Sequence, residues 1–174
     1  LVQSVRRLLE LSAKNAFDRL IAPDGFWDSQ VARLRLPDML GSRGNVIQSI
    51  LTSALFKDRM QHEFNRLAER GARRAAPIVA DAVEKIGIDN ARAILDGGPR
   101  AATGYLRTAM AGALIEAMIP ELGDAIRLSR DPLVAQALGA LTGVDVSNLA
   151  HDFAMQVDDA IWNQIGQEEQ AIRA

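Results

Sequence analysis

The chain contains no cysteine and only two histidines among its 174 residues, and aromatic residues make up 5% of it. Without cysteine, the fold cannot depend on disulfides, and thiolate metal sites and cysteine nucleophiles are excluded. His62 and His151 each stand beside an acid, and the chain has neither an HExxH nor a paired Glu-x-x-His pattern. Because a metal site usually needs three or four ligands at helical or loop spacing, we expect neither a metal nor another cofactor. The GxSxG nucleophile motif is absent as well.

Long apolar runs and a strong charge of one sign are also missing. No stretch of about 18 apolar residues occurs, so we expect no membrane-spanning helix. The formal net charge of -2 and the pI of about 5.7 give no general attraction to nucleic acid. Residues 1–107 carry 17 Lys and Arg against 12 Asp and Glu, whereas residues 108–174 carry 3 against 10. This asymmetry fits a basic half that packs against an acidic half, or a basic face that attracts phosphate or anionic headgroups.

Apolar residues at three- and four-residue steps dominate the chain, and this is the period of an amphipathic helix. The clearest example recurs every four residues near the C-terminus, at Leu149, Phe153, Val157, Ile161 and Ile165. With 48% hydrophobic and 24% charged residues, the chain has a globular composition and is long enough to bury a core. We predict an all-α fold for residues 1–174, a single helical bundle-like domain of roughly seven to nine helices without a sheet.

Prolines, glycines and capping residues predict where the helices end. Pro77 is expected to break or kink a helix over residues 45–86, and Pro120 is expected to begin a new one. Asp89 is expected to cap a short helix that ends before Gly97 and Gly98. An alanine-rich helix is predicted from residue 99 to residue 118, and a last helix is predicted to start at the cap Ser147.

The region between the first two long helices is predicted to be irregular. Pro23 and its neighbours end the first helix, and Phe26 and Trp27 are placed in a loop that folds back on the core. Residues 31–36 alternate weakly in hydropathy, which favours an extended connector because no second strand is available to pair with it.

Several polar residues stand where a buried face is predicted, and they are the candidate site residues. Arg66 and Glu69 share a helix face, and Asn65 lies on its buried edge. Two readings stay open for such residues, an exposed helical ion pair or a buried Arg–Glu network that lines a pocket. The full candidate ligand-binding set is Asn65, Arg66, Glu69, Thr103, Tyr105, Arg107, Glu168, Glu169 and Arg173. No metal ligand and no catalytic residue is assigned.

The chain resembles domain-of-unknown-function family 4197, a group of exported bacterial proteins. The similarity extends in order over nearly the whole chain. It is carried by Asp24-Gly25-Phe26, LRLP at 34–37, FNRLAERGARRAAPIVADAV at 64–83, residues 89–94, Gly97-Gly98, Ala101-Ala102-Thr103, Tyr105-Leu106-Arg107 and the block 159–173 that ends EEQAIR. The resemblance implies an all-α fold, an export signal in the precursor and a periplasmic or cell-envelope location. It implies no activity.

Three functions stay open at this point. The first is a non-enzymatic binder of a small apolar or amphipathic ligand held between helices, supported by the alanine-rich helix and by Met110 and Met118. The alternative is a protein-interaction or structural module that forms a homo-oligomer through an apolar face left on the last helix. The third is a hydrolase that uses Glu69, Glu168 or Glu169 as acid or base.

Overall fold

The computed structural model describes residues 1–34, 54–127 and 146–174, and within these ranges the chain is helical and contains no strand. This confirms the predicted all-α class, and the seven described helices lie within the predicted number. The helices are α1 (Val2–Ile21), α2 (Gly25–Asp28), α5 (Ala54–Lys85), α6 (Ala91–Leu95), α7 (Ala101–Met110), α8 (Ala113–Arg127) and α10 (Val146–Arg173).

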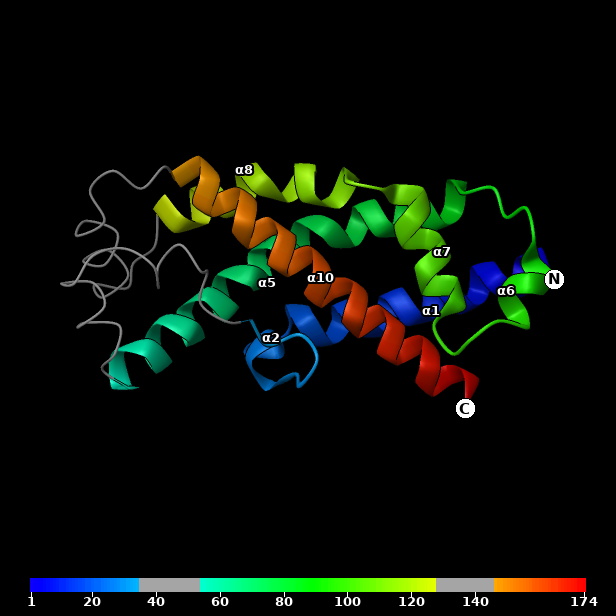
Figure 1. Cartoon of the computed structure of the whole chain (residues 1–174), viewed down its shortest axis with the longest axis horizontal. Coiled ribbons are helices and arrows are strands. Elements are labelled where there is room, and N and C mark those ends of the chain that lie inside the picture. The colour runs from blue at the N-terminus through cyan, green and yellow to red at the C-terminus, as the bar shows by residue number, and fades with distance from the viewer. Residues whose placement is uncertain (35–53, 128–145) are drawn as a thin grey trace.

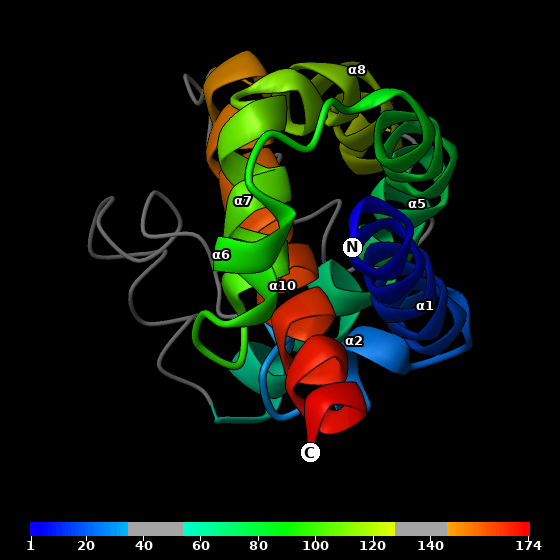
Figure 2. The same ribbon diagram turned by 90° about the vertical axis from the view of Figure 1, so that its right-hand side faces the viewer.

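Four long helices build the body of the molecule (Figures 1 and 2). Helix α1 packs against α5 and α10, and α8 packs against the same two helices, so the four close around one core. Helix α10 runs diagonally across the others, and the short helices α6 and α7 lie at the end of the molecule that also holds both chain termini (Figure 1).

The core is made by the apolar faces that the helical period predicts. The stripe Leu149, Phe153, Val157, Ile161 and Ile165 of α10 is fully buried. The rings of Phe64 and Phe153 meet edge to face, with centroids 5.1 Å apart, and so join α5 to α10. Large apolar side chains on each long helix therefore face one another, which stabilises the bundle mainly by removing apolar surface from water.

Neither proline ends a helix, so the new helix predicted to begin at Pro120 is wrong, and of the break or kink predicted at Pro77 the break is wrong. Helix α5 continues through Pro77, and α8 continues through Pro120. A proline inside a helix removes one backbone hydrogen bond and crowds the preceding turn. Both prolines are exposed, whereas buried residues such as Val79 and Leu122 hold the same turns against the core. Tertiary packing on the opposite face therefore outweighs the local preference for a helix end.

The single helix predicted from residue 99 to residue 118 is also wrong. Helix α7 ends at Met110, and Ala111 adopts a positive φ of 49° with ψ of -125° before α8 begins at Ala113. Leu106 before the turn and Leu114 after it are both fully buried. Alanine prefers the helical conformation, so its own preference does not explain the turn. The turn lets Leu106 and Leu114 reach the core from two helices that run in different directions, and we attribute it to this packing.

Three smaller boundary predictions need correction. Asn90 rather than Asp89 caps α6, since its Oδ1 accepts from the Ala93 N–H at 3.2 Å. Ser147 lies inside the first turn of α10 rather than before it. Phe26 is fully buried as predicted, but it belongs to the short helix α2 rather than to a loop. Of the predicted extended connector, residues 31–34 contain no strand, and the remainder lies outside the described residues.

Gly25 at the start of α2 is required by a close backbone approach. A Cβ atom at this position would lie 2.0 Å from the Arg19 carbonyl oxygen and 2.8 Å from that of Leu20. Only a residue without a side chain lets α2 fold back so tightly on the end of α1. This turn matters for the site because it brings α2 beside both α1 and α5.

Candidate functional site

The polar C-terminal end of α10 contributes a buried carboxylate cap, and Glu169 is its centre. Glu169 lies on α10 and is fully buried. Its carboxylate accepts from the backbone N–H of Ala102 at 3.1 Å, from the Thr103 N–H at 2.7 Å and from the Thr103 hydroxyl at 2.7 Å. These N–H groups belong to the first turn of α7, which has no intrahelical acceptor for them. Glu169 therefore caps α7 from another helix and complements its dipole.

Arg173 extends this cap to the end of α6. Its Nε donates to Glu169 at 2.6 Å, and its two terminal nitrogens donate to the carbonyls of Leu95 at 3.0 Å and Ile94 at 2.9 Å. Of the two readings left open by the sequence, a buried Arg–Glu pair is found at this end of α10, and that it lines a pocket stays a prediction. Both Glu169 oxygens and all three Arg173 guanidinium nitrogens bond to protein groups, so the arrangement joins α6, α7 and α10.

Glu168, the next residue, faces a different side of α10. Its carboxylate pairs with the Arg19 guanidinium of α1 at 2.9 Å and accepts from the Gln164 amide at 3.0 Å. Gln164 in turn accepts from the Ser29 hydroxyl at 2.7 Å. Arg19, Glu168, Gln164 and Ser29 form a hydrogen-bonded chain, here called the polar chain, that joins α1, α10 and the segment after α2. Glu168 and Glu169 therefore do not act on one common site.

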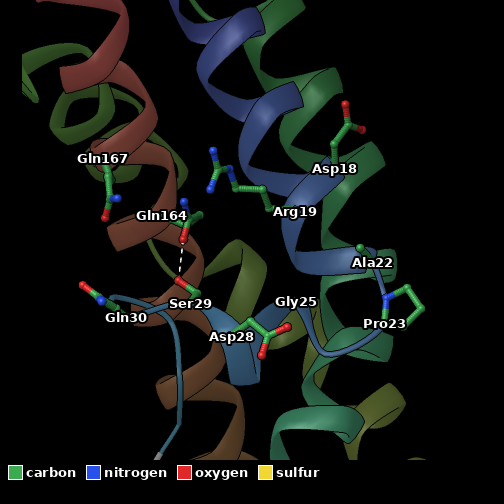
Figure 3. A pocket seen from close by; sticks show the side chains of 10 residues that line it. All are labelled: Asp18, Arg19, Ala22, Pro23, Gly25, Asp28, Ser29, Gln30, Gln164 and Gln167. Atoms are coloured by element: carbon green, nitrogen blue, oxygen red, sulfur yellow. Dashed lines mark hydrogen bonds between the residues drawn. The ribbon is translucent and has the colours of Figure 1, made fainter.

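The polar chain borders a hollow between α1, α2 and α10, here called the polar pocket (Figure 3). Its volume is about 600 Å³. In Figure 3 the guanidinium of Arg19 points from α1 toward α10, and the Gln164 and Ser29 side chains lie opposite it, joined by their hydrogen bond. The lining residues are Asp18, Arg19, Ala22, Pro23, Gly25, Asp28, Ser29, Gln30, Gln164 and Gln167.

Asn65 of α5 is buried as predicted, and its side-chain amide forms hydrogen bonds with backbone groups. Its side chain accepts from the Leu34 N–H at 2.6 Å and donates to the Leu34 carbonyl at 3.1 Å and the Gln61 carbonyl at 2.6 Å. With one donated and one accepted hydrogen bond, the Asn65 amide satisfies both backbone groups of Leu34, as a neighbouring strand would. Asn65 therefore fixes the path of the chain after α2.

Glu69 is held by the turn between α1 and α2. It accepts from the Asp24 N–H at 2.9 Å, and Asp24 sits in the left-handed region with φ of 59°. Burial raises the pKa of Glu69 above its ordinary value of 4.5, and the nearby Asp24 charge adds to the rise, while the Asp24 N–H and two arginines oppose it. Arg66, which shares this face of α5, does not form an ion pair with Glu69. Its side chain is largely exposed and pairs with Glu63 at 3.5 Å.

Asp24 is also part of a stacked cluster that the sequence did not predict. Its carboxylate lies 2.8 Å from Nε2 of His62, and the His62 ring stacks on Trp27 with centroids 4.5 Å apart. The Arg33 guanidinium lies over Trp27 at 4.3 Å from its centroid. The contacts of Asp24 and Trp27 with His62 join the start of α2 to α5, and Arg33 covers the Trp27 ring.

Tyr105 and Arg107 leave α7 in different directions, as their spacing predicts. The Tyr105 hydroxyl donates to the Gly87 carbonyl at 2.5 Å, which ties α7 to the segment after α5. Arg107 pairs with Asp159 and lies 3.6 Å from Asp158 of α10. Burial raises the pKa of Asp158, and the Trp162 N–H at 3.0 Å and the Arg107 charge oppose the rise.

A second hollow, here called the apolar groove, lies between α1 and α5 and has a volume of about 330 Å³. Its floor is apolar, with Phe17, Ala13 and Val83 buried beneath it. Its rim is charged. The complete lining is Glu10, Ala13, Lys14, Phe17, Asp18 and Ile21 of α1 and Ala76, Ala80, Val83 and Glu84 of α5.

The position of the apolar hollow differs from the one that the sequence indicated. Met110 and Met118, which supported a ligand cavity, line neither hollow, and Met118 is fully buried in the core. Sequence reasoning also missed Arg19, Ser29 and Gln164 of the polar chain. One signal was available, because Gln164 lies between Ile161 and Ile165 on the buried side of α10 and four residues before Glu168.

Among the described residues, no group of three or more His, Asp or Glu side chains is placed to hold a metal ion. In the same ranges, no helix combines the length and the apolar character needed to cross a bilayer.

Within the described residues, the fold is that of an all-α helical protein, with the polar pocket and the apolar groove on two flanks of α1. The chain belongs to the family described as "Protein of unknown function (DUF4197)", whose model matches residues 1–174. No curated protein and no solved structure matches the chain.

Proposed function

We propose that this protein is a non-enzymatic binding protein that holds a small amphipathic ligand in the apolar groove between α1 and α5. The observation that carries the proposal is the combination of an apolar floor, built by two long helices, with a charged rim. Ligand sites are usually hollows of about 300–1,000 Å³ with an apolar lining and a few polar groups, and the groove falls in this class.

The charges of the rim indicate the polar end of the ligand. Glu10, Asp18 and Glu84 bring three carboxylates to the rim, against the single ammonium of Lys14. Lys14 is already paired with Asp18 at 2.7 Å, and Arg7, which lies outside the lining, is 3.8 Å from Glu10, so Glu84 is the rim carboxylate for which the described residues show no ion pair. The rim is therefore net negative, and we propose that the ligand has an apolar part for the floor and a cationic head for the rim.

Ligand binding is proposed ahead of homo-oligomer formation because the apolar stripe of α10 is buried in the core of the same chain. Its five members are fully buried against the other helices. Among the described residues, the exposed large apolar side chains are Leu1, Val2, Met155 and Ile172. Met155 and Ile172 lie 17 positions apart on α10, so they do not form the continuous face that a homo-oligomer would need.

Binding is also proposed ahead of hydrolysis because the three candidate carboxylates are held by separate partners. Glu169 is enclosed by four donors, Glu168 is paired with Arg19, and Glu69 accepts from the Asp24 backbone. A pair of acid and base residues needs two carboxyl groups that converge on one cleft, and these three face different elements.

The groove is tested with a cationic amphiphile and a variant that fills it. Ala80 is exposed and lines the groove, so Ala80→Trp should occupy the space without disturbing the core. We expect decyltrimethylammonium, below its micelle concentration, to bind the native protein in isothermal titration and to bind Ala80→Trp about tenfold more weakly or worse. Decanoate, with the same tail and an anionic head, should bind more weakly than the cation.

The matched control is Ala109→Trp, which places the same side chain on an exposed position of α7 outside both hollows. It should bind the probe as the native protein does. Equal binding by Ala80→Trp and Ala109→Trp would show that the amphiphile does not occupy the groove, and no binding to the native protein would overturn the proposed function.

A further inference from the structure

We propose a second binding site in the polar pocket between α1, α2 and α10, and we assign it to a small neutral saccharide. It lies on the other flank of α1 from the apolar groove and shares only Asp18 with it. The proposal therefore stands independently of the amphiphile site. It is carried by the polar chain at the pocket wall and by the chemistry of the remaining lining.

The polar chain makes the pocket a built site rather than a gap between surface side chains. Gln164 is 2% exposed, yet it lines the pocket. Its amide is fixed by two partners, the Ser29 hydroxyl at 2.7 Å and the Glu168 carboxylate at 3.0 Å. An amide has two donor hydrogens and two acceptor positions, and these bonds use one of each, so the Gln164 amide is held in a fixed orientation. Such preorganisation lowers the entropy lost when a ligand binds.

The charges of the lining argue against a strongly charged ligand. Arg19 is neutralised by Glu168 at 2.9 Å, and Asp18 is neutralised by Lys14 at 2.7 Å. Asp28 is exposed and adds one carboxylate to the lining. This balance would repel an anion such as phosphate, and one exposed carboxylate is a weak attraction for a cation.

The lining is more polar than that of the apolar groove, which disfavours a purely apolar ligand. Apart from Gly25, its apolar members are Ala22 and Pro23, whereas Gln30, Gln164 and Gln167 contribute three side-chain amides. Amides pair with groups that both donate and accept, and hydroxyl groups are of this kind. A carboxylate such as that of Asp28 can accept from two neighbouring hydroxyls. The lining is thus suited to a molecule covered with hydroxyl groups, and a volume of about 600 Å³ admits a small one.

The test uses the full chain, labelled with ¹⁵N, and four neutral disaccharides as probes: maltose, cellobiose, trehalose and chitobiose. At least one should shift the side-chain amide signals of Gln164 and Gln167 in a concentration-dependent way. The variant Asp28→Ala combined with Gln167→Ala removes two exposed lining groups, so the fold should persist. Its Kd for the same disaccharide should rise about tenfold or more, the loss expected for one or two hydrogen bonds to the ligand.

The matched control is Asn163→Ala, which removes an exposed amide of α10 that does not line the pocket. It should leave the Kd unchanged. The proposal is overturned if none of the four disaccharides shifts these signals, or if the lining variant binds as tightly as the control. A shift caused by the dipeptide Ala-Ala but by none of the sugars would assign the pocket to a peptide and overturn the saccharide class.

Discussion

Single residues decide how the short helices are attached to the bundle. Glu169 and Arg173 stand in one helix, four positions apart, but their partners lie on α6 and α7, some 66 to 79 positions earlier in the chain. A carboxylate supplies acceptors for the free N–H groups at one helix start, and a guanidinium supplies donors for the free carbonyls at another helix end. One ion pair therefore completes two helix termini.

We expect Glu169→Ala to be among the most damaging substitutions in this chain. It would leave the buried backbone N–H groups of Ala102 and Thr103 without an acceptor and Arg173 without its carboxylate. Breaking a buried, hydrogen-bonded charge pair costs about 3–5 kcal/mol, and urea denaturation should report a loss of this size. Glu168→Ala, whose partner Arg19 is 68% exposed, should cost clearly less. A similar loss for both variants would contradict the capping role.

Glu69 should make the stability of the protein depend on pH. Burial raises its folded-state pKa above 4.5, so the folded protein holds this proton more tightly than the unfolded chain does. Stability should therefore fall as the pH rises from 4.5 through the folded-state pKa, and remain lower above it. In Glu69→Gln the amide oxygen can still accept from Asp24, but the charge is absent. This part of the pH dependence should disappear when denaturation is measured from pH 4 to pH 8.

The control for this effect is Glu116→Gln, which changes an exposed glutamate of α8. It should keep the pH dependence of the native protein. If Glu69→Gln also kept it, the burial of Glu69 would not be the source of the effect.

At the scale of elements, packing overrides local preference in several helices. Pro77 and Pro120 are carried through α5 and α8 because the opposite faces of these helices are buried. Ala111 shows the opposite case. Alanine favours a helix, yet this residue ends α7 with a positive φ, which is unfavourable for a residue with a side chain. In both cases the gain comes from apolar side chains that reach the common core.

We expect Ala111→Gly to stabilise the protein. Holding a non-glycine residue at positive φ costs about 1–3 kcal/mol. Glycine removes this cost, but its greater freedom in the unfolded chain lowers the free energy of unfolding by about 0.5–1 kcal/mol. The net gain of roughly 1 kcal/mol should raise the Tm by about 2–4 °C in a scanning calorimetry experiment. Ala109→Gly, two positions earlier inside α7, should instead lower the Tm by a similar amount. A lower Tm for both variants would show that the turn at Ala111 is not strained.

At the scale of the whole molecule, the four long helices of the described ranges enclose one core, and the polar pocket and the apolar groove lie on the flanks of α1. One hollow is apolar with a charged rim, and the other is polar with a fixed hydrogen-bonded wall. The two differ in the chemistry they can accept, and so the proposed ligands differ. This arrangement is the reason for proposing binding rather than catalysis.

The resemblance to exported bacterial proteins leads to a proposal about location. We propose that the mature protein works in the periplasm or cell envelope, where a chain without cysteine folds in the same way as in a reducing compartment. The full-length gene product with a C-terminal tag should appear in the periplasmic or envelope fraction of its host, beside a periplasmic marker enzyme. Recovery with a cytosolic marker would contradict the proposal.

The sequence alone determined the fold class and the apolar faces of the long helices, and it left open whether Glu69 and Glu169 are buried or exposed. The four-residue stripe of α10 and the burial of Asn65 follow from periodicity, because an amphipathic helix has one way to bury its apolar face. Tertiary structure alone decided the partners. Glu169 joins Thr103, Glu168 joins Arg19, and the apolar groove opens beside Ala80 rather than beside Met110, because such pairings depend on helices that are distant in the sequence. Local rules fix which side of a helix turns inward, and only the packing of the whole chain fixes what it meets there.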